Sequence, residues 1–186
     1  MRFHRFITGA LAAALGCGGH PPAPPPPCEQ QCQDGTALRA LRETMRVAYN
    51  GELMGMPVGM QDATYDCLEG GTAHVFGDAS SNPAQGSTFV NLTYVFTNCV
   101  HFAVPSPTPE RNYQMTLNGT ATEHCTIAVQ PTATTSLRIK SDAMSFDGEV
   151  NDPPIKYHEE SCPVDVAQDG NNLSGLLCGR PAGFGF

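Results

Sequence analysis

The 186-residue sequence contains no tryptophan, few charged side chains and only one notable apolar run near its start. That run is shorter than the roughly 20 residues that a membrane-spanning helix needs. Lys and Arg number 10 against 18 Asp and Glu, so the formal net charge is −8. Because a phosphate backbone is bound mainly through Lys and Arg, this balance argues against nucleic acid as a partner. The charged fraction of 15% is typical of β-rich domains outside the cytoplasm.

The chain also lacks the motifs of nucleophilic catalysis. No G-x-S-x-G segment is present, and no nucleophile stands beside a base at a spacing typical of such sites. The stretch YHEESC groups His158, Glu159 and Glu160, but adjacent strand residues point to opposite faces and would not converge. We therefore predict that the protein is not an enzyme and has no cofactor, with hydrolysis through His158 as a third hypothesis.

The first 17 residues have the plan of a secretory signal peptide. Arg2 and Arg5 precede the apolar stretch FITGALAAALG, which ends in small residues. Its end, Ala13-Ala14-Leu15-Gly16-Cys17, resembles the lipobox of bacterial lipoproteins. The resemblance implies that residues 1–16 are removed and that Cys17 is lipidated. Gly18 after it resembles the version sent to an outer membrane.

A proline tract follows the predicted anchor and gives residues 17–35 the character of a spacer. The tract PPAPPPP cannot form a helix interior or a sheet ladder, because proline lacks the amide donor. As polyproline II it extends by about 3.1 Å per residue, or about 22 Å in total. We expect a lipid-anchored protein of the cell envelope, at the outer membrane and facing the periplasm, whose domain is held clear of the bilayer.

Residues 36–186 are expected to form a single β-rich domain that begins with an amphipathic helix over 36–49. Asp34 or Thr36 is placed to cap the start of this N-terminal helix, and Asn50-Gly51 supplies a stop. Four apolar residues form one stripe at helical spacing. They are Leu38, Leu41, Met45 and Ala48.

Three arginines line another face of the same predicted helix: Arg39, Arg42 and Arg46. Such a face binds anionic lipid headgroups when the positive charge is dense enough. It is otherwise a solvated face beside an acidic domain. Three charges fall short of a polybasic cluster, so the second interpretation is favoured.

After the helix the hydrophobic period changes to two. In STFVNLTYVF the apolar residues share one face, and NYQMTLNGTATEHCTIAV alternates over a longer span. Ser141-Asp142 is predicted to be a two-residue turn that places Ile139 opposite Met144. We predict a mainly β fold, an antiparallel meander of about six to eight strands that forms a sandwich or an open or closed up-and-down barrel. An open, cupped sheet covered by the helix is a third possibility.

Eight cysteines favour an oxidising compartment. Without Cys17 seven remain, and Cys125 stands among apolar residues of an alternating strand. A buried free thiol behaves as a small hydrophobe, so Cys125 is the candidate for the unpaired one. Cys28 and Cys32 are either joined to each other or unpaired.

The other four cysteines are disulfide candidates by spacing. A hairpin about Asn82-Pro83 brings Cys67 opposite Cys99. Cys162 and Cys178 bracket a short loop, and a bond between them would contribute about 3 kcal/mol by loop entropy.

The segment MGMPVGM has two interpretations. Met54, Met56 and Met60 offer thioethers, the soft ligands that select Cu(I). The favoured interpretation places them on one face of a strand, together with Val58, because methionine commonly fills gaps in a core.

These observations predict a cell-envelope lipoprotein that acts as a binding or structural module. It either holds an apolar ligand against the concave side of the sheet or docks on another envelope protein. The ligand form predicts more inward apolar surface than one helix can cover, whereas the docking form predicts an exposed patch or an open strand edge. The alternative is a periplasmic copper-binding protein that uses the methionine-rich segment.

Overall fold

The computed structural model describes residues 27–186 except 83, 85, 104–105, 109–110 and 129–134. The predicted signal peptide, the anchor Cys17 and most of the proline tract lie outside the described residues. Cleavage of residues 1–16 and lipidation of Cys17 stay predictions.

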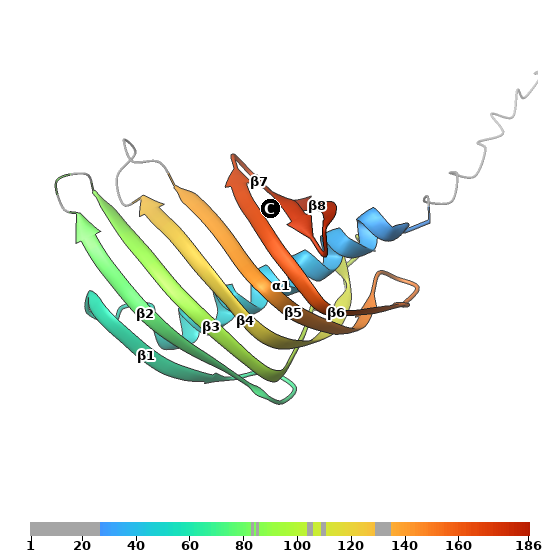
Figure 1. The fold of residues 1–186 in the computed structure, drawn as a ribbon, viewed down its shortest axis with the longest axis horizontal. Coiled ribbons are helices and arrows are strands. Elements are labelled where there is room, and N and C mark those ends of the chain that lie inside the picture. The colour runs from blue at the N-terminus through green and yellow to red at the C-terminus, as the bar shows by residue number, and fades with distance from the viewer. Residues whose placement is uncertain (1–26, 83, 85, 104–105, 109–110, 129–134) are drawn as a thin grey trace, which may run out of the picture.

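Eight strands form one open antiparallel sheet in which each strand pairs with its neighbours in sequence (Figure 1). They are β1 (Gly59–Asp66), β2 (Thr72–Asn82), β3 (Ser87–Phe102), β4 (Tyr113–Ala128), β5 (Ser136–Val150), β6 (Ile155–Asp169), β7 (Asn172–Leu177) and β8 (Arg180–Gly185). The sheet curves around one helix, α1 (Gln30–Glu52), which lies across its inner face. The described strands thus form the open, cupped sheet rather than the two packed sheets of a sandwich.

The helix α1 is longer than the predicted helix 36–49. It spans Gln30–Glu52, so residues 30–35 belong to it and not to the predicted spacer 17–35. Neither Asp34 nor Thr36 caps its start, because both lie inside the helix, which begins at Gln30. The Asp34 carboxylate instead accepts hydrogen bonds from Arg180 on β8. The predicted apolar stripe is confirmed, since all four of its residues lack exposed surface: Leu38, Leu41, Met45 and Ala48.

The core lies between α1 and the inner face of the sheet. The alternation of β3 is confirmed, because its four predicted inward residues are buried: Val90, Leu92, Tyr94 and Phe96. Burial of one such side chain contributes about 2 kcal/mol relative to leaving it in water. Extended over eight strands and one helix, this alternation fixes which face of the sheet α1 covers.

The predicted turn at Ser141-Asp142 is wrong. Both residues lie inside the continuous strand β5, which has a bulge between Ser141 and Met144 where it pairs with β6. The Ser141 hydroxyl donates to the Thr120 carbonyl across the sheet (2.6 Å). The extra residue shifts the alternation by one position, so Ile139 and Met144 both face inward without a turn between them.

Three disulfides are present: Cys28–Cys32, Cys67–Cys99 and Cys162–Cys178. The Cys67–Cys99 and Cys162–Cys178 bonds confirm the pairs predicted from spacing. Cys28 and Cys32 are joined to each other, which is one of the two predicted alternatives. Among the described residues, Cys125 is the free cysteine. Three disulfides fit a location outside the cytoplasm. No helix in the described part of the chain is long and apolar enough to cross a membrane.

Candidate functional site

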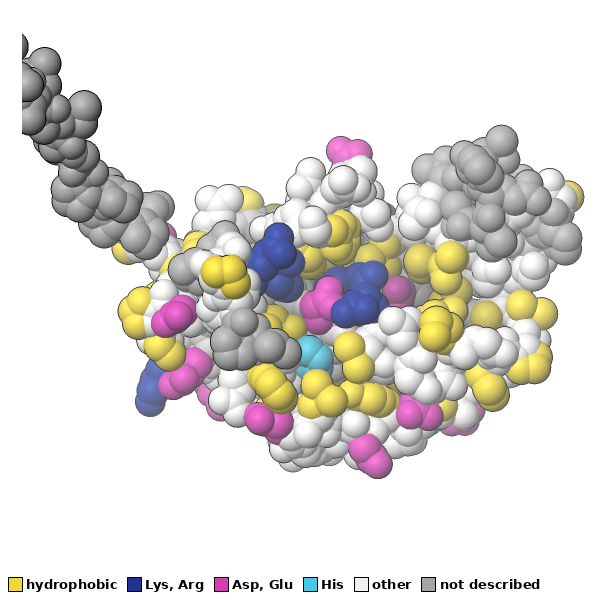
Figure 2. Space-filling model, turned by 180° about the vertical axis from the view of Figure 1, so that it is seen from behind, with side chains coloured by type: hydrophobic (Ala, Val, Ile, Leu, Met, Phe, Trp, Pro, Cys, Tyr) yellow, Lys and Arg dark blue, Asp and Glu magenta, His cyan; other side chains and the backbone are white. Residues whose placement is uncertain are grey.

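A cavity of about 210 Å³ remains between the second half of α1 and strands β3 to β6. Figure 2 shows basic and acidic side chains gathered in the middle of this face of the molecule, bordered by hydrophobic side chains. The apolar wall of the cavity comes from Val90, Ile127 and Leu137. Its polar wall combines Glu123 with residues of α1, among them Arg42. The site is therefore amphipathic.

Glu123 is the buried charge-bearing group of this cavity. Its Oε2 accepts a hydrogen bond from the Tyr94 hydroxyl at 2.7 Å. Burial raises the pKa of the Glu123 carboxyl, although the Tyr94 hydrogen bond and the charge of Arg42 act in the opposite direction. Burial, with the nearby Glu123 charge, also raises the pKa of Tyr94, so the phenol keeps its proton and remains a donor.

Sequence reasoning missed Glu123, but a signal was present. Glu123 has the same parity on β4 as Met115, Leu117 and Cys125, which face inward. The structure places Ala121 and Glu123 on that inner face as well. A glutamate in phase with core residues is costly to bury unless it is hydrogen-bonded, and this marks it as a candidate functional residue.

Arg42 is the cation of the cavity without an ion pair among the described residues. Its Nε is buried and has no hydrogen-bond partner, and its guanidinium carbon lies 6.0 Å from the centre of the Phe186 ring. Arg46, in contrast, bonds Glu43 at 2.6 Å. Arg42 thus brings to the cavity a positive charge that acts on Glu123 and forms no ion pair with a described residue.

The predicted solvated arginine face is only partly correct. Arg46 is exposed, but Arg39 and Arg42 are half-buried. Arg39 lies 4.3 Å above the centre of the Phe184 ring and donates to the Gly185 carbonyl at 3.0 Å. These contacts arise because β8 packs beside α1, a neighbour that sequence spacing does not reveal.

The thiol of Cys125 opens onto the same cavity. Burial and the nearby Glu123 raise its pKa to about 11. The same burial raises the pKa of Tyr49 on α1. At neutral pH both groups keep their protons, so the cavity offers hydrogen bonds and a cation rather than a thiolate nucleophile.

A second polar cluster joins the start of α1 to the far edge of the sheet. Asp34 is fully buried and accepts hydrogen bonds from Arg180 (2.8 and 2.9 Å), Tyr157 (2.8 Å) and Gln30 (2.9 Å). Arg180 also donates to Glu159 at 2.5 Å. Burial acts to raise the pKa of Asp34, but these bonds together lower it. Both carboxylate oxygens of Asp34 accept hydrogen bonds. The cluster therefore joins α1 to strands β6 and β8.

The YHEESC residues separate as predicted. Glu159 belongs to the Asp34 cluster, whereas His158 bonds Asp147 at 2.9 Å on the exposed face. Glu160 lies 3.5 Å from the other nitrogen of the His158 ring. The hydrogen bond that His158 donates to the Asp147 carboxylate raises the pKa of His158. The three residues do not converge on one site.

The prediction that Met54, Met56 and Met60 share one face of a strand is wrong. Strand β1 begins only at Gly59, and residues 53–55 form the turn that follows α1. All three side chains are exposed, by 68%, 58% and 82%. Gly55, in the turn after α1, adopts a φ of +88°, in the left-handed region that favours glycine. These methionines therefore fill no gap in the core.

No family model, no curated protein and no solved structure matches this chain. Function is accordingly inferred from the geometry of its residues. Of the sites described, the cavity beside Glu123 and Arg42 combines a buried titratable group, an unpaired cation and an apolar wall, which are the usual components of a small-molecule site.

Proposed function

We propose that the protein is a cell-envelope lipoprotein that binds a small amphipathic anion between α1 and the sheet. The observation that carries the proposal is Arg42, which forms no ion pair with a described residue and lines the cavity together with an apolar wall and the buried Glu123. A ligand carboxylate would accept hydrogen bonds from Arg42. Its apolar tail would lie against Val90 and Leu137, which the helix leaves in contact with the cavity.

The volume limits the ligand. An engineered apolar cavity of about 150 Å³ is large enough for benzene, so the cavity of about 210 Å³ suits an acid of about eight carbons. The helix covers most of the inward apolar surface. The predicted apolar ligand on the concave side of the sheet is therefore a short one in this proposal.

The location is part of the same proposal. The disulfides fit a compartment outside the cytoplasm, and the sequence Leu15-Gly16-Cys17 supports a lipid anchor. Mass spectrometry of the mature protein from a bacterial envelope would then show acyl mass on Cys17. A mature protein without that mass contradicts the anchor.

Ligand binding is tested with octanoate and residues 18–186, which contain the whole described fold. We expect saturable binding by calorimetry, and Arg42→Gln should weaken it about tenfold, since one charged hydrogen bond contributes about 1.5 kcal/mol or more. Arg39→Gln is the matched control, because Arg39 lies on the same helix and does not line this cavity. Absence of binding, or equal loss in both variants, contradicts the proposal and leaves docking on an envelope protein.

A second candidate function is Cu(I) binding through Met54, Met56 and Met60. It is favoured by their exposure, because thioethers that do not pack in a core are free to coordinate a soft metal. Replacing all three by Leu should abolish Cu(I) retention against a competing chelator while leaving the melting temperature unchanged. Unchanged retention contradicts this function.

A further inference from the structure

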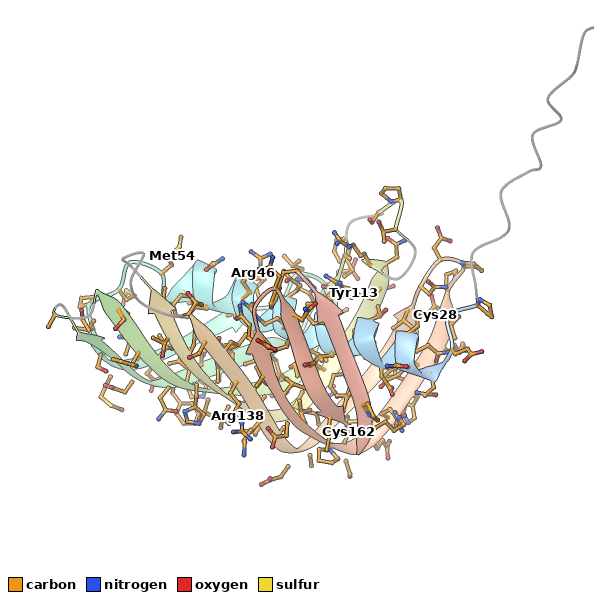
Figure 3. The ribbon with its side chains drawn as sticks, turned by 90° about the horizontal axis from the view of Figure 1, so that it is seen from above. Cys28, Arg46, Met54, Tyr113, Arg138 and Cys162 are labelled. Carbon is orange, nitrogen blue, oxygen red and sulfur yellow. A yellow bond between two sulfur atoms is a disulfide. The ribbon has the colours of Figure 1, made fainter. Side chains whose placement is uncertain are left out.

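The outer face of the sheet carries a groove of about 420 Å³, whose lining shares Val90, Cys125, Leu137 and Gln168 with the cavity. Figure 3 shows Arg138, which lines this groove, on the side of the sheet away from α1 and Arg46. Its volume lies within the range of about 300 to 1,000 Å³ that is usual for small-molecule sites. The groove is built by strands β2 to β6, so a rigid sheet positions its side chains.

The strand register places four hydrogen-bonding side chains in one row across the groove. Asp78 pairs with Asn91, Asn91 with His124, and His124 with Arg138. Neighbouring strands are about 4.8 Å apart, so the row is about 14 Å long. From one end to the other it offers an acceptor, an amide that both donates and accepts, an imidazole and a donor.

The adjacent row supplies an aromatic ring and a floor of small side chains. Ser80 pairs with Phe89, Phe89 with Thr126, and Thr126 with Ser136. Phe89 is 42% exposed on this face and lies beside the polar row. Its ring has no aromatic partner in the described part of the chain. An exposed phenyl ring beside a row of polar groups suits a ligand with one apolar face and hydroxyls at its edge.

The charges of the groove favour a neutral ligand. The Arg138 guanidinium bonds both oxygens of Asp165 at 3.0 and 3.1 Å, so its charge is compensated. Lys140, next along the same face, lies 3.5 Å from the same carboxylate. Asp78 remains as an acceptor for hydroxyl groups. The lining therefore has hydrogen-bonding capacity without a surplus of positive charge for an anion.

From this arrangement we propose that the outer groove binds a neutral oligosaccharide. Sugar hydroxyls both donate and accept, which matches the alternating row from Asp78 to Arg138. The C–H face of a sugar ring packs on the negative face of an aromatic ring, the position that Phe89 offers. The groove and the cavity share four lining residues, but Glu123 and Arg42 line the cavity alone, so the two proposals rest on different polar side chains.

The test is an NMR titration of residues 18–186 with two trisaccharides, tri-N-acetylchitotriose and maltotriose. We expect at least one of them to shift the amide signals of β2 to β5 at millimolar concentration. Phe89→Leu keeps bulk but removes the ring, and His124→Ala shortens the row. Each should weaken binding about fivefold or more, since loss of one contact of this kind costs about 1 kcal/mol.

Phe76→Leu is the matched control. Phe76 is exposed on the same face at 37%, but it packs beside His74 at 5.1 Å and does not line the groove. Binding should be unchanged in this variant and in Arg42→Gln. The proposal is overturned if neither trisaccharide shifts the signals, or if Phe76→Leu loses as much affinity as Phe89→Leu. Octanoate binding is measured in Phe89→Leu as well. It should be unchanged, because Phe89 does not line the cavity, so a failure of the oligosaccharide proposal is distinguished from a failure of the anion proposal.

Discussion

The pKa of Glu123, a lining residue of the cavity, affects how the stability of the fold depends on pH. Burial raises this pKa, so the folded state holds the proton more strongly than the unfolded state. Stability contributed in this way is present below the unfolded pKa near 4.3 and is lost as pH rises through the folded pKa. Ionisation of the Glu123 carboxyl is therefore less favourable in the folded state than in the unfolded state.

We expect Glu123→Gln to be at least as stable as the parent at pH 7. The advantage should shrink as pH falls towards 4, because the parent carboxyl becomes protonated and resembles the amide. Thermal melts between pH 4 and 8 measure the difference. Glu160→Gln controls for surface charge, since Glu160 is exposed. A variant that is less stable than the parent, by a margin that grows with pH, would show that the ionised form of Glu123 stabilises the fold.

The pKa of Asp34 is shifted in the opposite direction from that of Glu123. Its pKa is lowered despite burial, so its contribution is present above the unfolded pKa near 3.9 and is lost as pH falls through the folded value. Asp34→Asn leaves Arg180 without its buried partner and should cost about 3 kcal/mol at pH 7 in urea unfolding. Asp165→Asn breaks an exposed pair and should cost much less. Equal losses would mean that the Asp34 cluster does not hold α1 to β8.

These residues also show where sequence reasoning stops. The parity of β3 and the stripe of α1 were predictable, because local periodicity encodes them. The role of Asp34 was not, since its partner Arg180 is 146 positions away. At Ser141 a polar pair within a strand looked like a turn, because a bulge and a turn both shift the alternation. Met54 was misplaced because alternating methionines and glycines resemble a strand.

At the scale of elements, the disulfides differ in what they tie together. Cys67–Cys99 links the β1–β2 connection to β3 across 32 positions, whereas Cys28–Cys32 closes over the first turn of α1. Chain entropy makes the longer loop worth about 4 kcal/mol and the shorter one about 2 kcal/mol. Replacing each pair by Ala and measuring urea unfolding should reproduce this order. The reverse order would indicate that the start of α1 is held chiefly by its cross-link rather than by the Asp34 cluster.

Helix α1 is the inner layer of the fold and runs from one end of the molecule to the other. Figure 3 places Cys28 and Met54 at opposite ends of the molecule, near the two ends of α1. A 23-residue helix is about 34 Å long. The exposed Met54 thus lies at the end of the molecule away from Cys28, the cysteine nearest in sequence to the predicted anchor Cys17. That position suits contact with a copper donor or with another envelope protein.

The sheet depends on this inner layer. Residues of every strand from β1 to β8 contribute buried apolar side chains to the core that α1 completes. An antiparallel sheet with an uncovered apolar face exposes far more than the few hundred Å² that monomers tolerate. Residues 59–186 produced without α1 should therefore show no cooperative thermal transition in near-ultraviolet circular dichroism.

A cleaved form of the same protein provides the control for this prediction. A protease site introduced at Val58, which is exposed between α1 and β1, cuts the chain without removing the helix. The two pieces should stay associated, because the packing of Leu41 and Met45 against the sheet does not need the connecting peptide bond. The nicked protein should then melt cooperatively near the temperature of the parent. If residues 59–186 melted equally well alone, the sheet would be stable without α1, and the cavity would be a gap beside an accessory helix rather than a site built between two dependent layers.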